Sequence, residues 1–284
     1  MGVRTDRSVV AERHRDKQVI IVAGPTASGK SALALAIAER FGGEIINADS
    51  MQVYKEIKVL SARPDEKGVK HHLYGFVSVK ENFSVGQWHA IASKKIKEIN
   101  KKNKIAIIVG GTGLYFKVLI DGLVDIPEVP KIDYKLNPMG RHNMINHFSK
   151  EYPGIFDNIN LNDPQRLYRA ISIYQHTGIT LSDWLSKKNK KYFNYEDFIK
   201  VCLIPPKSEI EKRIEKRFIQ MLKNGAIEEA KKFHKLDVWK NVLFSSNSII
   251  GLREIDHYLR KVISMNELKK QVLIRTRRYA KRQY

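Results

Sequence analysis

Short apolar runs alternate with helical segments over most of the chain. Four runs rich in Ile and Val predict buried strands, at residues 18–23, 44–48, 104–109 and 198–205. Segments with helical spacing lie between or after them, at residues 31–41, 91–102, 112–121 and 207–224. Because strand and helix alternate, we predict an α/β fold in which helices flank a parallel sheet.

This alternation stops near Asp125. A proline-rich loop follows, and residues 128–198 have helical spacing without a clear buried strand. We therefore predict a mainly helical inserted domain at 128–198. The α/β core would then consist of residues 18–127 and 199–284 and would end in basic helices. The polar residues 1–17 are predicted to form a flexible lead-in.

The strongest motif is GPTASGKS at residues 24–31, which matches G-x-x-x-x-G-K-[ST] between a predicted strand and a predicted helix. The pattern predicts a P-loop NTPase-like sheet, in which main-chain N–H groups and the helix dipole hold a phosphate. Lys30 would neutralise the terminal phosphate, and the Ser31 hydroxyl would bind Mg²⁺. The predicted diphosphate-binding residues are Gly24, Pro25, Thr26, Ala27, Ser28, Gly29, Lys30 and Ser31.

A phosphate-binding loop does not identify a reaction. Nucleotide hydrolysis, kinase chemistry and displacement of diphosphate from carbon all use one. Ordinary P-loop ATPases place a magnesium-binding Asp at the end of a later apolar strand. Here the predicted strand at 104–109 is followed by Gly-Gly-Thr, which argues against a generic ATPase.

Three polar side chains outside the loop are candidates for chemistry. Asp49 follows the strand at 44–48, at the carboxyl edge where open α/β sheets bind ligands, although Asp is also a favoured helix N-cap. Thr112 follows another strand at the same edge and either caps a helix or contacts a ligand. Arg217 shares a helix face with Arg213, and the pattern alone favours solvated charges there.

The composition favours a polyanionic partner. The chain has 51 Lys and Arg against 30 Asp and Glu, a formal net charge of +21. Basic residues gather at 187–191 and 260–284, which suits a nucleic acid, an acidic membrane surface or plain solubility. The single cysteine, Cys202, excludes an internal disulfide and a zinc cluster. No apolar run approaches a membrane span, so we predict a cytoplasmic protein without a membrane partner.

Taken together, these segments resemble the tRNA dimethylallyltransferases, also called tRNA isopentenyltransferases. The similar segments follow the family's order and cover nearly everything after residue 18. Apart from the phosphate-binding loop none is a generic motif, so the joint match is specific. They are GPTASGKS (24–31), NADSMQVY (47–54), SARP (61–64), HHL (71–73), FSVGQW (83–88), GGTGLYFKVLIDGL (110–123), NDPQRLYRAI (162–171), TGITLSDW (177–184), EKRIEKRFIQML (211–222), IIGLREI (249–255) and TRRYAKRQ (276–283).

The resemblance implies transfer of a dimethylallyl group from its diphosphate to N6 of the adenosine on the 3′ side of the tRNA anticodon. It implies that Asp49 is the general base, that Thr112 lines the reaction channel, and that Arg217 stabilises the leaving diphosphate with Lys30 and Mg²⁺. The inserted domain and the basic C-terminal helix would hold the anticodon arm of tRNA, and we expect a monomer. Positions that match the family's tRNA contacts are Asp49, Ser50, Met51, Gln52, Gln165, Arg166, Leu167, Tyr168, Arg169, Ser248, Gly251 and Arg253.

The chain departs from the family pattern at four places. Leu252 stands where a tyrosine is usual before Arg253, and the stretch 125–165 is shorter than usual. Ser61 stands where threonine is common, and the chain stops at Tyr284, where relatives continue with an aromatic segment. Leu252 removes a stacking or hydroxyl contact, and the missing aromatic segment is expected to weaken helix docking or RNA affinity.

Three other functions stay open at this stage. A small-molecule or nucleoside kinase would use the same loop but would have no use for a net charge of +21. Prenylation of free adenine nucleotides would not need the insertion or the basic tail. An RNA-binding protein with a relic loop would not need Asp49 together with Lys30 and Ser31.

Overall fold

The computed structural model describes residues 19–66, 68–130, 140–240 and 244–284. The predicted lead-in at 1–17 lies outside the described residues. The chain divides into two compact units, one formed by Met1–Ile120 with Tyr192–Tyr284 and the other by Asp121–Lys191. The second unit overlaps the insertion predicted at 128–198, and both of its boundaries come earlier in the chain.

The first unit contains a sheet of five parallel strands in the order β3-β2-β4-β1-β5. Val19 of β1 pairs with Ala106 of β4 on one side and with Phe198 of β5 on the other. All carboxyl ends therefore lie at one edge of the sheet, where ligands of such sheets bind. The parallel sheet predicted from the sequence is confirmed. The strands are β1 (Val19–Ala23), β2 (Gly43–Asn47), β3 (His71–His72), β4 (Ile105–Gly110) and β5 (Phe198–Cys202).

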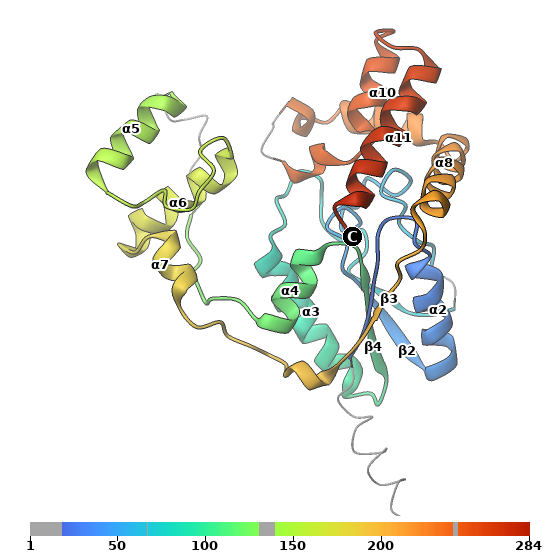
Figure 1. Ribbon diagram of the computed structural model, residues 1–284, viewed down its shortest axis with the longest axis horizontal. Helices are drawn as coiled ribbons and strands as arrows, with labels where there is room; N and C mark the ends of the chain where they lie inside the picture. Colours follow the sequence, from blue (N-terminus) through green and yellow to red (C-terminus); the bar gives the residue numbers. More distant parts are fainter. Residues whose placement is uncertain (1–18, 67, 131–139, 241–243) are drawn as a thin grey trace, which may run out of the picture. The chain divides into compact units, whose positions relative to one another are not determined.

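Helices cover both faces of this sheet, with α2 on one face and α3 and α4 on the other (Figure 1). Ala34 and Ala38 of α2 pack with Val22 and Ile107, and because strand side chains alternate, their neighbours along the strands face the opposite layer. The helix α3 begins earlier than the 91–102 segment predicted, because Ser84 forms a capping box at its start. These helices are α2 (Lys30–Phe41), α3 (Val85–Asn100) and α4 (Gly113–Asp121).

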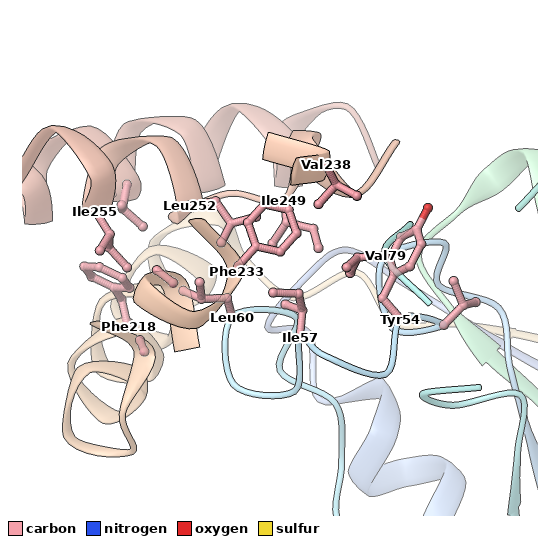
Figure 2. Packing of buried hydrophobic residues seen from close by; sticks show 14 of the residues in the cluster. Tyr54, Ile57, Leu60, Val79, Phe218, Phe233, Val238, Ile249, Leu252 and Ile255 are labelled. Carbon is pink, nitrogen blue, oxygen red and sulfur yellow. The ribbon is translucent and has the colours of Figure 1, made fainter. Parts of the chain in front are cut away.

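A helical layer follows β5 and packs on the loop after β2. Phe233 and Leu252 share a hydrophobic cluster with Ile57 and Leu60 of that loop (Figure 2). Full burial of one such side chain contributes about 1.5–3 kcal/mol to folding. Leu252 is fully buried, so the residue that departs from the family pattern fills the core. The elements are α8 (Lys207–Lys223), α9 (Ala226–His234), α10 (Leu252–Leu259), α11 (Met265–Lys281) and the 3₁₀ turns Tyr195–Asp197, Asp237–Lys240 and Ser245–Ser248.

The second unit is built from helices in its described part. Its core joins Met144 and Ile155 to Leu167 and Ile171. An antiparallel bridge between Leu123 and Lys190 brings the two ends of the unit together. The helices are α5 (Arg141–Glu151), α6 (Pro164–Thr177) and α7 (Leu181–Ser186). None of the helices in the described ranges of either unit has the length and apolar composition needed to cross a membrane.

Candidate active site

The loop between β1 and α2 is tightly curled. Ser28 N donates to Pro25 O over 3.1 Å, and Lys30 N lies 3.4 Å from the Ser28 hydroxyl. Gly29 precedes α2 with φ 95°, which only glycine adopts without strain. Ala27 has φ 63°, in the left-handed region that side chains other than glycine seldom enter. Such strain is typical of binding loops whose main-chain N–H groups must converge.

Lys30 carries a half-buried, destabilised positive charge. Its ammonium donates to Pro25 O over 3.2 Å. Burial lowers the pKa of Lys30 to about 8, an effect that Asp49 opposes and Arg217 reinforces. Lys30 is therefore mostly protonated at neutral pH. A bound anion would offset the cost of desolvating this charge and its repulsion by Arg217.

Arg217 reaches the loop from α8, far away in the sequence. Its Nη1 donates to Thr26 Oγ1 over 3.0 Å. Burial lowers the pKa of Arg217, and the Asp49 carboxylate opposes that fall. One turn earlier, Arg213 Nη1 donates to Ser28 O over 2.9 Å. Arg217 is therefore not the solvated charge that the helical pattern alone favours. Arg213 is exposed, as that pattern predicts, although it also binds the phosphate-binding loop.

Asp49 lies at the carboxyl edge of the sheet, close enough to Lys30 and Arg217 to affect the pKa of both. Its Oδ1 accepts from Met51 N over 2.9 Å, which forms a turn and not a helix start. The alternative that Asp49 caps a helix is therefore wrong. Asn47, the last residue of β2, stabilises this turn. Its Oδ1 accepts from Asp49 N over 2.8 Å, and its Nδ2 donates to Asp49 O over 2.9 Å.

Thr112 joins the end of β4 to the Asp49 turn. Its Oγ1 accepts from Ser50 N over 3.2 Å, and its side chain also hydrogen-bonds Tyr279 of α11. The preceding Gly110 packs against the main chain, since a Cβ there would lie 2.0 Å from Ala48 O. The end of β4 therefore needs glycine for close contact with the main chain that leads from β2 to Asp49.

Three tyrosines lie near enough to Asp49 to feel its charge, of which Tyr115 is buried and Tyr74 and Tyr279 are half-buried. Burial raises the pKa of Tyr74, Tyr115 and Tyr279, and the nearby Asp49 carboxylate raises each further. Tyr115 stacks on Trp88 with ring centroids 4.3 Å apart. The sequence did not identify these rings as site residues, although Tyr115 and Tyr279 lie in segments that resemble the family and Tyr74 directly follows one. Their phenols stay neutral at physiological pH.

The positions predicted to contact tRNA differ in what their side chains do. Those in the first unit include Met51 and Ser248, whose Sδ and Oγ atoms lie 3.7 Å apart, so the structure brings these two segments together. Gln52 Nε2 donates to Ser61 O and Ala62 O, and this holds the loop in shape. Arg253 is exposed.

Two positions predicted to contact tRNA also have structural roles. Gly251 is buried with φ 105°, and a Cβ there would lie 2.8 Å from Leu60 Cδ2. Leu167 is fully buried in the core of the second unit. Its neighbours Gln165, Arg166 and Arg169 on α6 are exposed and Tyr168 is half-buried, so α6 presents polar and basic groups to solvent.

Comparisons with known proteins agree on one family. A family model described as IPP transferase matches residues 52–284. The chain is 48% identical over 278 residues to the tRNA dimethylallyltransferase of Pelagibacter ubique strain HTCC1062, covering 94% of this chain and 88% of that protein. It is 37% identical over 273 residues to the tRNA dimethylallyltransferase of Hyphomonas neptunium, covering 93% and 86%.

Solved structures give the same result. The full-length tRNA isopentenylpyrophosphate transferase from Bacillus halodurans matches with a TM-score of 0.65 and 28% identity, over 94% of this chain and 85% of that one. A eukaryotic dimethylallyltransferase, described as acting on tRNA, matches with a TM-score of 0.77 and 29% identity. That match covers 94% of this chain and 69% of the eukaryotic one.

Proposed function

Because the chain belongs to the IPP transferase family, we propose that it transfers a dimethylallyl group from dimethylallyl diphosphate to N6 of the adenosine on the 3′ side of the tRNA anticodon. One observation supports this most: the Asp49 carboxylate is coupled to two half-buried cations, Lys30 and Arg217, at the carboxyl edge of the sheet. Proton transfer and departure of an anion require these opposite charges side by side.

In the proposed reaction, N6 of adenine attacks the allylic carbon while the bond from that carbon to the diphosphate oxygen breaks. The electron pair of the broken bond leaves with the diphosphate, whose growing charge Lys30, Arg217 and the N–H groups of the phosphate-binding loop stabilise. Asp49 accepts the proton that N6 loses. The neutral rings of Tyr74 and Tyr115 provide electron-rich surface near a centre that becomes positive in the transition state.

The donor set of the loop fits a magnesium ion. Ser31, in the first turn of α2, is exposed, and its hydroxyl would bind the ion together with diphosphate oxygens and water. The described residues contain no group of three or more His, Cys, Asp and Glu that could hold a metal, and magnesium bound mainly by phosphates needs none. When bound, the ion would neutralise charge on the leaving diphosphate.

We propose that tRNA is held by its backbone through basic surface, given the net charge of +21. In the first unit this surface includes Arg253 and the basic side chains of α11, and in the second unit it includes Arg166 and Arg169. The target base must leave its stack to reach Asp49, which costs a few kcal/mol in a duplex and less in a loop. A cytoplasmic monomer is the expected form.

The direct test is to incubate the protein with labelled dimethylallyl diphosphate, Mg²⁺ and unmodified tRNA. Label in the RNA at one adenosine supports the proposal, whereas label on AMP, or no label, rejects it. Asp49→Asn is the sharpest variant, because the amide oxygen still accepts from Met51 N but takes up no proton. We expect its kcat to fall at least about 10²-fold.

Asp65→Asn is the matched control, because Asp65 is an exposed aspartate of the same unit. Its turnover should stay within about 2-fold of the parent, since surface substitutions away from special features are usually mild. Binding of magnesium diphosphate, measured by calorimetry, should persist in both variants. Near-normal turnover of Asp49→Asn would show that Asp49 is not the base.

A further inference from the structure

The end of α11 lies against two loops of the site. Gln283 follows the helix, and its main-chain N–H donates to Ala280 O over 2.9 Å, so a helical turn continues through it. Its side-chain Oε1 accepts from Thr26 N over 2.7 Å, and its Nε2 donates to Gly111 O over 2.9 Å. One amide therefore joins the phosphate-binding loop to the turn after β4.

Gly111 makes this bridge possible. A Cβ at that position would lie 2.3 Å from Gln283 Nε2 and 3.3 Å from Gly24 O. A side chain at position 111 would therefore have to displace the Gln283 amide. Tyr279, four residues before Gln283 and so on the same helix face, hydrogen-bonds the side chain of Thr112. Two side chains at one helix end thus reach the same turn.

We propose that Gln283 is a positioning residue that sets the spacing between the phosphate-binding loop and the Gly111–Thr112 turn. Thr26 is held from two helices, at its N–H by Gln283 and at its Oγ1 by Arg217. An uncharged amide does not exchange protons with substrate at neutral pH, so Gln283 acts through the loops it joins. The effect on rate rests on the proposed prenyl transfer, where misplacement of a reacting group by about 1 Å costs about 10²-fold.

The test compares Gln283→Met with Gln271→Met. Methionine keeps the approximate length of glutamine and removes both hydrogen bonds. The control residue Gln271 lies on α11, where its Nε2 donates to Glu267 Oε1 over 3.1 Å. We expect Gln283→Met to lower kcat at least about 10-fold with a KM for dimethylallyl diphosphate within about 3-fold. The control should stay within about 2-fold, and the two melting temperatures should agree within about 3 °C.

A double-mutant cycle sharpens the test. Gly111→Ala pushes the Gln283 amide away, so alone it should lower kcat about 10-fold, but in a Gln283→Ala background it should add less than about 2-fold. Additive losses would overturn the proposal. So would a Gln283→Met kcat within about 2-fold of the parent, or an activity loss explained by lost folded protein.

Hydrogen exchange at the Thr26 amide tests the bridge without any assay of turnover. Exchange should be at least about 10-fold faster in Gln283→Met than in the parent and unchanged in Gln271→Met. If the parent labels no tRNA, the proposed function fails, and the exchange result then decides on the bridge alone. An unchanged exchange rate at the Thr26 amide in Gln283→Met would refute the proposed bridge.

Discussion

Binding of diphosphate should weaken as the pH rises through the pKa of Lys30. In the free protein this pKa is lowered to about 8, chiefly by burial. A bound diphosphate favours the protonated ammonium and so raises the pKa in the complex. The affinity is therefore fully present below the pKa of the free protein and declines above it.

The magnitude follows from the fraction of Lys30 that is protonated before binding. If only the protonated form binds, the apparent Kd is raised about 2-fold at pH 8 and about 11-fold at pH 9, relative to pH 6.5. Binding at pH 8 should also take up about half a proton, which appears as a dependence of the calorimetric heat on the buffer.

Diphosphate itself titrates in this range, so the parent needs a reference with the same ligand. Lys30→Arg provides it, because the guanidinium stays protonated throughout. Calorimetry with magnesium diphosphate from pH 6.5 to 9 gives the ratio of the two Kd values, in which the titration of the ligand cancels. A ratio of Kd values that stays constant over this range would refute the assignment of Lys30 as the titrating cation of the phosphate-binding loop.

Two stability predictions concern carboxylates away from the diphosphate. Burial would raise the pKa of Glu44, but hydrogen bonds from His72 and Lys104 lower it to about 2. Ionised Glu44 therefore contributes about 3 kcal/mol to the free energy of unfolding above pH 4.5, and this contribution is lost as the pH falls toward 2. Urea unfolding should show the parent and Glu44→Gln differing by this amount at pH 7 and converging near pH 2. Glu229 accepts from the N–H groups of residues 58–60, so Glu229→Gln should lower the unfolding free energy by about 1–3 kcal/mol. An equal loss in the neighbouring exposed Glu228→Gln would contradict that role.

Local patterns predicted the elements that local forces determine. The apolar runs predicted four of the five strands, and the loop motif was recognisable because its glycines and its flanking strand and helix are all local. The two-residue strand β3 is too short to produce a pattern. The early start of α3 has a local signal in Ser84 followed three residues later by Gln87, a capping box that the prediction of a helix at 91–102 did not include.

The roles of single side chains in the site depended on tertiary contacts. Asp49 resembled a helix cap because Asp is common there, and only the Asx turn to Met51 separates the two cases. Arg217 resembles a solvated charge in the sequence, because a helical repeat does not show that its side chain binds Thr26, 191 residues earlier in the chain. Gln283 had no local signal at all, since its partners lie 257 and 172 residues away.

The location of Arg217 and Gln283 has a consequence for how the site is built. The sheet supplies the phosphate-binding loop, Asp49 and Thr112. The second cation lies on α8 and the bridging amide directly after α11, both of which follow β5 in the chain. Bringing Arg217 beside Lys30 lowers the pKa of Lys30, so completing the site makes the free protein electrostatically less favourable. Packing of α8–α11 on the loop after β2 offsets that cost. A bound diphosphate relieves it directly, so the same cations that weaken the free state would strengthen binding of the substrate's leaving group.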